Sequence, residues 1–157
     1  RLARPVRQLI LVSAGRLGLQ RADLPAFAAW RGQTGEARMA AHRRNLEIIM
    51  FHDPGRIDAR ALAVQDSNTP RRRLRTERLD TGPSLHWLLG QSRIPVTGIW
   101  AAGDRTIGPY LAERVAFMAT LAAPARSIIL PATGHWLQYE SAACCNAVLD
   151  ALLAADS

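Results

Sequence analysis

The sequence predicts an α/β fold, in which three parallel strands are flanked by helices and a helical segment is inserted between the first strand and the second. Three short apolar runs, at residues 6–12, 96–100 and 127–130, have the length and composition of buried strands. Helical periodicity follows the second and third runs, and such alternation of strand and helix is typical of a parallel sheet. With 157 residues, 48% of them hydrophobic, the chain has the size of one globular unit with a sizeable core.

Each expected strand ends in residues that favour a turn. The first, Val6–Val12, runs into Ser13–Gly15. The second, Val96–Trp100, is entered through a proline and followed by a glycine, and the third, Ser127–Leu130, ends at a proline. None of the three alternates between apolar and polar residues as a half-exposed strand does. We therefore expect both faces of the sheet to be covered.

Two helices are expected beside these strands. After the second strand, Pro109 suits the first turn of a helix, and apolar residues then recur at helical spacing. These residues are Leu111, Val115, Met118 and Leu121. After the third strand, the same periodicity predicts a C-terminal helix, with the apolar positions Val148, Leu149, Leu152 and Leu153.

Residues 17–93 interrupt this alternation with helical patterns and no convincing strand. One helix is expected at Glu36–Phe51, and Asp58 suits the N-cap of a second. A short third helix is expected near Ser84–Leu89, with Gly90 as its C-cap. The chain is therefore divided into a core strand at residues 1–16, a helical insertion at 17–93 and a C-terminal core at 94–157.

The positive charge comes from arginine alone. The net charge is +7, and all 20 basic residues are arginines. Together with abundant alanine, this bias favours a GC-rich bacterial coding sequence over a nucleic-acid partner. Five arginines crowd residues 71–78. We interpret them as a solvated surface or a rim that attracts a carboxylate, because the aromatic residues that accompany nucleic-acid recognition are not apparent.

Membrane, disulfide and metal chemistry find no support in the sequence. No run reaches the roughly 18 apolar residues of a membrane span and no leader pattern is found, so we expect a cytoplasmic protein with no membrane partner. The two cysteines, Cys144 and Cys145, are adjacent and are expected to be free thiols. No histidine has a zinc-ligand spacing, so neither a metal nor a cofactor is predicted.

Two strand ends each carry a residue suited to proton transfer. Asp104 lies four positions after Trp100, and His135 lies five after Leu130. Because ligands bind at the carboxyl edge of an open parallel sheet, we expect both residues at that edge. A carboxylate bonded to one imidazole nitrogen leaves the other nitrogen free to take a proton from a nucleophile. Their separation of 31 positions, one helix and one strand, fits neighbouring parallel strands.

Three segments resemble the α/β-hydrolases. Ile94–Pro109 (IPVTGIWAAGDRTIGP) resembles their acid-bearing strand and turn, and Leu130–Leu153 (LPATGHWLQYESAACCNAVLDALL) resembles their histidine segment. Arg4–Leu19 (RPVRQLILVSAGRLGL) is similar to the strand before their helical cap. Within the histidine segment, the His135-Trp136 pair, Gln138–Glu140 and Asn146 are similar to the subgroup that hydrolyses carbon–carbon bonds in meta-cleavage products of aromatic-ring degradation. The resemblance implies the C-terminal part of an α/β-hydrolase fold, with residues 17–93 as the cap.

Carried onto this sequence, the resemblance makes Asp104 the acid and His135 the base of a Ser-His-Asp triad, with Trp136 as a wall of the substrate pocket. In the carbon–carbon hydrolases a cap arginine helps to hold the substrate. Its counterpart here is Gln65, unless the Arg71–Arg73 run supplies an arginine instead. The implied partner is a small-molecule substrate, a carboxylate included, and it stays open between an ester and a dienoic acid of the meta-cleavage type.

The nucleophile has no counterpart in this sequence, since Gly-x-Ser-x-Gly does not occur. The chain opens on Arg1, and we expect the serine and the oxyanion hole to lie in an N-terminal half outside it, which turnover requires. The alternative interpretation is a non-catalytic protein, either a relic of a hydrolase or an interaction module that uses its basic face.

Overall fold

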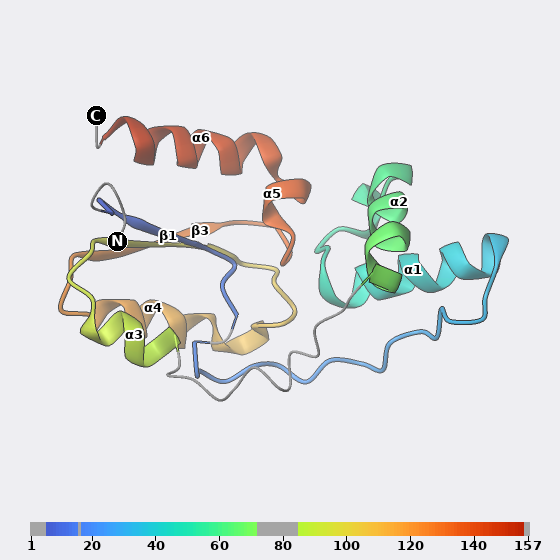
Figure 1. Cartoon of the computed structure of the whole chain (residues 1–157), viewed down its shortest axis with the longest axis horizontal. Coiled ribbons are helices and arrows are strands. Elements are labelled where there is room, and N and C mark those ends of the chain that lie inside the picture. The colour runs from blue at the N-terminus through green and yellow to red at the C-terminus, as the bar shows by residue number, and fades with distance from the viewer. Residues whose placement is uncertain (1–5, 16, 72–84, 156–157) are drawn as a thin grey trace.

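The computed structural model describes residues 6–15, 17–71 and 85–155, and it shows a parallel sheet with helices on both faces (Figure 1). In chain order the elements are β1 (Leu9–Val12), α1 (Gly35–Ile49), α2 (Ala59–Asn68), α3 (Leu85–Gln91), β2 (Val96–Ala101), α4 (Leu111–Ala119), β3 (Ala125–Leu130), α5 (Leu137–Glu140) and α6 (Ala142–Ala154). Single turns of 3-10 helix lie at Pro54–Arg56, Thr69–Arg71 and Gly108–Tyr110.

The three predicted strands are confirmed as one parallel sheet in the order β1-β2-β3. Two of them start at other residues than expected. β1 begins at Leu9 rather than Val6, and β3 begins at Ala125 rather than Ser127. Both of these first residues pair with Val96, the first residue of β2. The central strand therefore sets where its neighbours begin, which local composition does not reveal.

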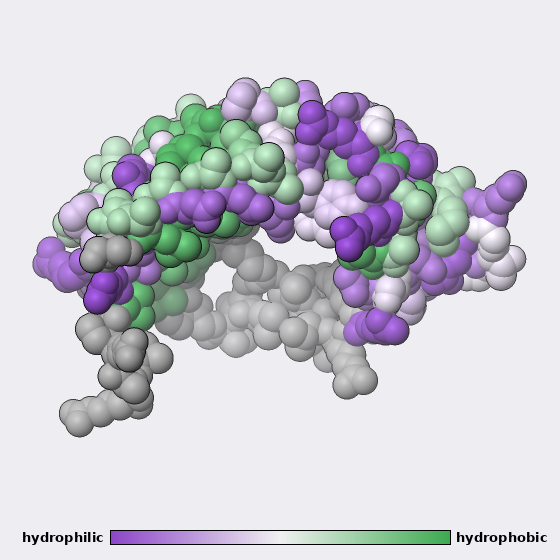
Figure 2. All heavy atoms as spheres, turned by 90° about the horizontal axis from the view of Figure 1, so that it is seen from above, coloured by the Kyte–Doolittle hydropathy of each residue, from purple (hydrophilic) through white to green (hydrophobic). Residues whose placement is uncertain are grey.

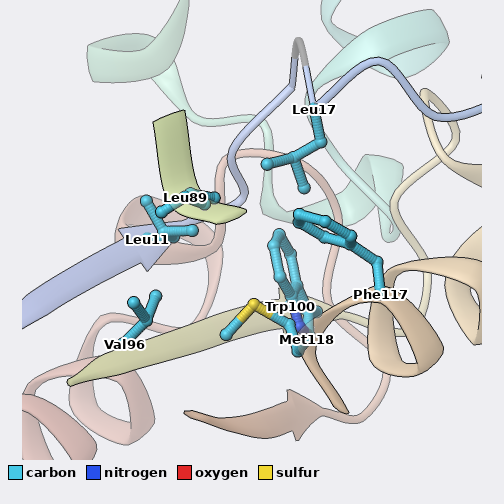
Figure 3. Packing of buried hydrophobic residues seen from close by; sticks show 7 residues of the cluster. All are labelled: Leu11, Leu17, Leu89, Val96, Trp100, Phe117 and Met118. Atoms are coloured by element: carbon cyan, nitrogen blue, oxygen red, sulfur yellow. The ribbon is translucent and has the colours of Figure 1, made fainter. Parts of the chain in front are cut away.

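α3 and α4 cover one face of the sheet, and Trp100 of β2 lies at the centre of the core there (Figure 3). The fully buried indole donates its N–H to Ser127 Oγ at 3.1 Å. The other members of this core are Leu11, Leu17, Leu89, Val96, Phe117 and Met118. Gly98 makes room for the indole, because a β-carbon at this position would lie 2.4 Å from the ring.

α6 covers the opposite face. Ile99 and Ala101 of β2 point to this side, so alternate residues of the strand enter different cores. Their buried partners are Leu130, Leu137, Cys145 and Leu152. Every residue of β2 is buried, as expected for a parallel strand that is covered on both faces.

The helices at residues 35–49, 59–68 and 85–91 confirm the three predicted in the insertion, although the first ends at Ile49 rather than Phe51. Asp58 caps α2 as predicted, since its carboxylate accepts the backbone N–H of Ala61 at 2.8 Å. The predicted C-cap role of Gly90 is wrong. Gly90 lies within α3, and the chain turns after Gln91, where the backbone N–H of Ser92 donates to the Leu89 carbonyl.

α1 and α2, with the connection between them at residues 50–58, form an α1–α2 lobe that has its own small core. This core contains Leu46, Phe51, Ile57 and Ala61. α3 lies within residues 17–93 but packs on the sheet, so the domain boundaries at 16 and 93 stay a prediction. Figure 2 shows a hollow between the side of the molecule that carries α6 and the side that carries the α1–α2 lobe. No helix in the described part of the chain has both the length and the apolar character that a membrane crossing requires.

Candidate active site

Asp104 lies in a tight turn that directly follows β2. Its backbone N–H donates to the Ala101 carbonyl at 3.2 Å, and its own carbonyl accepts from Ile107 and Gly108 at 3.1 and 2.9 Å. Its side chain is completely buried. The turn therefore holds a carboxylate inside the protein at the carboxyl edge of the sheet.

His135 lies in the neighbouring loop, which follows β3. The two loops are joined where the backbone N–H of Gly103 donates to the Thr133 carbonyl at 2.8 Å. Across them, His135 Nδ1 lies 2.7 Å from Asp104 Oδ2. The imidazole contacts the buried carboxylate on one side. Because 27% of the His135 side chain is exposed, it is also accessible to solvent. The structure thus brings together the two residues that the strand ends predicted.

Thr106 completes the acid's surroundings, and the sequence reasoning missed it. Its backbone N–H and its hydroxyl both donate to Asp104 Oδ1, at 2.9 and 2.7 Å. The hydroxyl oxygen also lies 3.4 Å from His135 Nδ1. The signal was present in the Asp-x-Thr spacing, because a carboxylate often accepts the backbone N–H two residues later in a turn.

These contacts settle the charge of the acid. Burial acts to raise the pKa of Asp104, but the hydrogen bond and charge of His135 and the two Thr106 bonds outweigh it and hold the pKa below its ordinary value. An ionised Asp104 can only accept a hydrogen bond, so we assign the proton to His135 Nδ1. The other nitrogen, Nε2, then carries the lone pair that a general base needs.

Trp136 directly follows His135, but its ring packs on the α1–α2 lobe. It stacks on Tyr139 at a centroid distance of 4.8 Å and meets Phe51 edge-on at 5.9 Å. Its backbone N–H donates to the Met50 carbonyl at 2.9 Å. Its predicted role as a pocket wall stays a prediction.

Gln65 lines a cavity of about 520 Å³ between α1, α2 and the segment before α1. The remaining lining residues are Phe27, Ala28, Ala29, Trp30, Arg31, Asn45, Ile49, Met50, Asn68 and Thr69. Neither Asp104 nor His135 lines this cavity, so the described residues do not place Gln65 in one pocket with the pair. Of the arginine cluster, Arg71 donates to Ser67 Oγ at 2.6 Å. The other members, Arg72, Arg73, Arg75 and Arg78, lie outside the described residues.

Glu140 is a second residue of interest at this site, to which the sequence reasoning assigned no role. It is only 4% exposed, and its carboxylate accepts backbone N–H groups from the loop before His135 and from the α1–α2 connection. No local signal could have predicted its hydrogen bonds to the connection, because these partners lie 87 and 88 positions away in the sequence.

Ser13 directly follows β1, the position relative to a strand at which a nucleophilic serine could lie. It has a positive φ of 42°, and its buried hydroxyl has no hydrogen-bond partner among the described residues. The hydrogen bond that the structure gives it runs from its backbone N–H to the Ile99 carbonyl. The described part of the chain also holds no group of three or more histidine, cysteine, aspartate or glutamate side chains arranged for a metal ion.

A parallel sheet covered on both faces, with a buried aspartate bound to a partly exposed histidine at its carboxyl edge, places the chain in the α/β class of proteins. Neither a protein-family model nor a curated protein sequence matches the chain. Solved structures do. A mutant of the meta-cleavage product hydrolase CumD matches with a TM-score of 0.59 and 16% identity, over 92% of this chain and 54% of its own.

A second match is a serine hydrolase from the polyaromatic-hydrocarbon-degrading bacterium Cycloclasticus zankles. It has a TM-score of 0.55 and 15% identity, over 94% of this chain and 55% of its own. The chain therefore has the α/β-hydrolase fold, as the sequence predicted, and spans about half the length of these two structures.

Proposed function

We propose that this chain carries the acid and the base of a Ser-His-Asp hydrolase that acts on a carbonyl substrate. The observation that carries the proposal is the 2.7 Å contact between Asp104 Oδ2 and His135 Nδ1 at the carboxyl edge of the sheet. The partial exposure of the imidazole supports it, because a base must reach both its acid and its substrate.

In the proposed reaction, His135 Nε2 takes the proton of a hydroxyl as that oxygen attacks the carbonyl carbon. The imidazolium that forms is stabilised by the ionised Asp104. It then gives the proton to the leaving group as the bond from the carbonyl carbon to that group breaks. A water molecule, activated by the same nitrogen, releases the acid product, so the net reaction consumes one water for each bond cleaved.

The attacking hydroxyl is proposed to come from a segment outside these residues. Gly-x-Ser-x-Gly, the motif that presents a serine on a strand-to-helix turn, does not occur in the chain. The proposal therefore includes an N-terminal partner segment that supplies the serine and the oxyanion hole. An in-frame strand and Gly-x-Ser-x-Gly in the DNA directly upstream would support it, and a start codon close to Arg1 would count against it.

The proposed substrate is a small carbonyl compound, either an ester or a dienoic acid of the meta-cleavage type. The solved structures favour the second class, because one is a meta-cleavage product hydrolase and the other comes from a bacterium that degrades polyaromatic hydrocarbons. Gln65 supports neither class, because an amide at this position offers hydrogen bonds but no charge for a carboxylate.

The experiment compares wild type with His135→Ala in the protein expressed with all the residues that its gene encodes. Hydrolysis of p-nitrophenyl acetate and of a meta-cleavage dienoic acid is measured for both. We expect kcat to fall by on the order of 10³ or more in the variant, because the general base is lost. The 157-residue chain alone should hydrolyse p-nitrophenyl acetate no faster than its own His135→Ala variant.

Equal turnover of both substrates by His135→Ala and wild type would end the assignment of the base. Absence of turnover in the wild type would favour the alternative, a non-catalytic relic or a basic interaction module.

A further inference from the structure

The carboxylate of Glu140 lies five residues after the base, at the end of α5, and it bridges two distant parts of the chain. Oε1 accepts the backbone N–H groups of His52 and Asp53, at 3.0 and 2.7 Å. Oε2 accepts the backbone N–H of Gly134 at 2.6 Å and shares that of His52 at 3.0 Å. One buried side chain thus links the α1–α2 connection to the residue that precedes His135.

The residue that follows His135 is fixed to the same connection. The backbone N–H of Trp136 donates to the Met50 carbonyl at 2.9 Å. His135 is therefore held on both sides by backbone N–H groups. That of Gly134 donates to the Glu140 carboxylate, and that of Trp136 donates to the Met50 carbonyl.

We call the contact of residues 134–140 with residues 50–58 the joint. Two further hydrogen bonds link its two segments. The guanidinium of Arg56 donates to the backbone carbonyl of Glu140, and the hydroxyl of Tyr139 donates to Asp58 Oδ1 at 2.7 Å. The backbones also approach closely, because a β-carbon on Gly134 would lie 2.5 Å from the His52 nitrogen. Gly134 therefore packs directly against the backbone of residues 50–52.

The acid loop touches the joint as well. A β-carbon on Gly103, the residue before Asp104, would lie 2.3 Å from His52 Nδ1. The loops of the acid and the base therefore both pack on the first residues of the α1–α2 connection. Residues 50–53 are therefore in contact with the loops of both Asp104 and His135.

We propose that Glu140 is a positioning residue, which fixes the backbone around His135 to the α1–α2 connection and so couples the α1–α2 lobe to the hydrogen bond between His135 and Asp104. The proposal rests on the proposed function for the role of His135 as the base. It adds that the α1–α2 lobe sets the position of the base through one buried carboxylate.

The test is Glu140→Gln, which keeps the size of the side chain. A glutamine has a single acceptor oxygen and directs its NH₂ group at one set of backbone N–H donors, so it can hold Gly134 or the His52–Asp53 pair but not both. The control is Glu36→Gln, the same change at an exposed position in the first turn of α1.

The primary measurement is the ¹H resonance of His135 Nδ1–H in ¹⁵N-labelled protein. In Glu140→Gln we expect this resonance to broaden or vanish, and the protection of the Gly134 amide from hydrogen exchange to fall at least about tenfold. The remaining spectrum should stay dispersed. In the expressed protein, kcat should fall by on the order of 100-fold with a smaller change in KM, because a displaced base loses alignment rather than substrate.

A merely structural Glu140 would give a variant that unfolds in less urea but keeps the His135 resonance and the Gly134 protection of wild type, and that result would overturn the proposal. If Glu140→Gln does not fold, hydrogen exchange of the unchanged protein decides. The amides of His52, Asp53 and Gly134 should then share one opening free energy, and independent opening of Gly134 would contradict the coupling.

The two proposals fail in distinguishable ways. If His135→Ala hydrolyses as fast as wild type, the proposed function fails, while the resonance and exchange measurements still decide whether Glu140 fixes the loop. If His135→Ala is inactive but Glu140→Gln keeps the wild-type resonance, protection and kcat, only the positioning role fails.

Discussion

At the scale of single residues, the site depends on how a buried carboxylate is kept ionised. Asp104 accepts hydrogen bonds on both of its oxygens, from Thr106 on one and from His135 on the other. Since these bonds favour the charged form, the acid orients the imidazole without itself taking a proton at neutral pH.

This environment predicts a pH dependence of folding. Because the folded-state pKa of Asp104 is lowered from its ordinary value of 3.8, its contribution to stability is present above that value and is lost as the pH falls through the folded-state pKa. The difference in the free energy of unfolding between wild type and Asp104→Asn should therefore shrink below about pH 4. Urea unfolding from pH 7 to pH 3 measures it, and a difference that does not vary with pH would argue against an ionised Asp104.

The sequence predicted Asp104 and His135 because each stands at a fixed short distance from a recognisable strand end, and parallel strands bring such ends together. It did not predict Glu140 as a partner of His52 and Asp53, because these hydrogen bonds cross 88 and 87 positions. Long-range partners of a buried charge follow from packing between lobes, which a local pattern does not contain.

At the scale of elements, the sequence predicted a helix boundary correctly where a side chain forms the capping hydrogen bond. Asp58 is such a case, since its carboxylate binds the first turn of α2. Gly90 was assigned wrongly, because a glycine ends a helix only where the backbone turns left-handed, and α3 continues through it. The starts of β1 and β3 depend on pairing with Val96 rather than on their own composition.

Two glycines, Gly134 in the loop after β3 and Gly90 in α3, give a pair of opposite predictions for the free energy of unfolding. Gly134→Ala should destabilise the protein by about 1–3 kcal/mol, because the new β-carbon would meet backbone atoms of His52, Met50 and Phe51 that cannot move cheaply. Gly90→Ala should instead stabilise it by up to about 1 kcal/mol, since the position is helical and a β-carbon there would meet no atom from outside its own helix within 4 Å. Urea unfolding measures both changes, and a Gly134→Ala variant as stable as wild type would mean that the two segments do not approach so closely.

At the scale of the whole molecule, the structure places two lobes around one loop. The sheet presents Asp104 and His135 from adjacent strand ends, and the α1–α2 lobe binds the backbone on either side of His135 (Figure 1). The sequence anticipated both the parallel sheet and the helical insertion, because each has its own periodicity. It could not show that the insertion binds the loop of His135, since that contact joins backbone groups and one carboxylate that lie far apart in the sequence.

The central claim is that the Asp104–His135 pair performs catalysis. The most direct test is kcat for Asp104→Asn, in the protein expressed with all the residues that its gene encodes, beside Asp150→Asn, the same change at an exposed position on α6. We predict that Asp104→Asn lowers kcat by on the order of 10⁴, because an amide no longer holds the imidazole in the required tautomer, and that Asp150→Asn leaves kcat unchanged. Equal kcat values for the two variants would contradict the account.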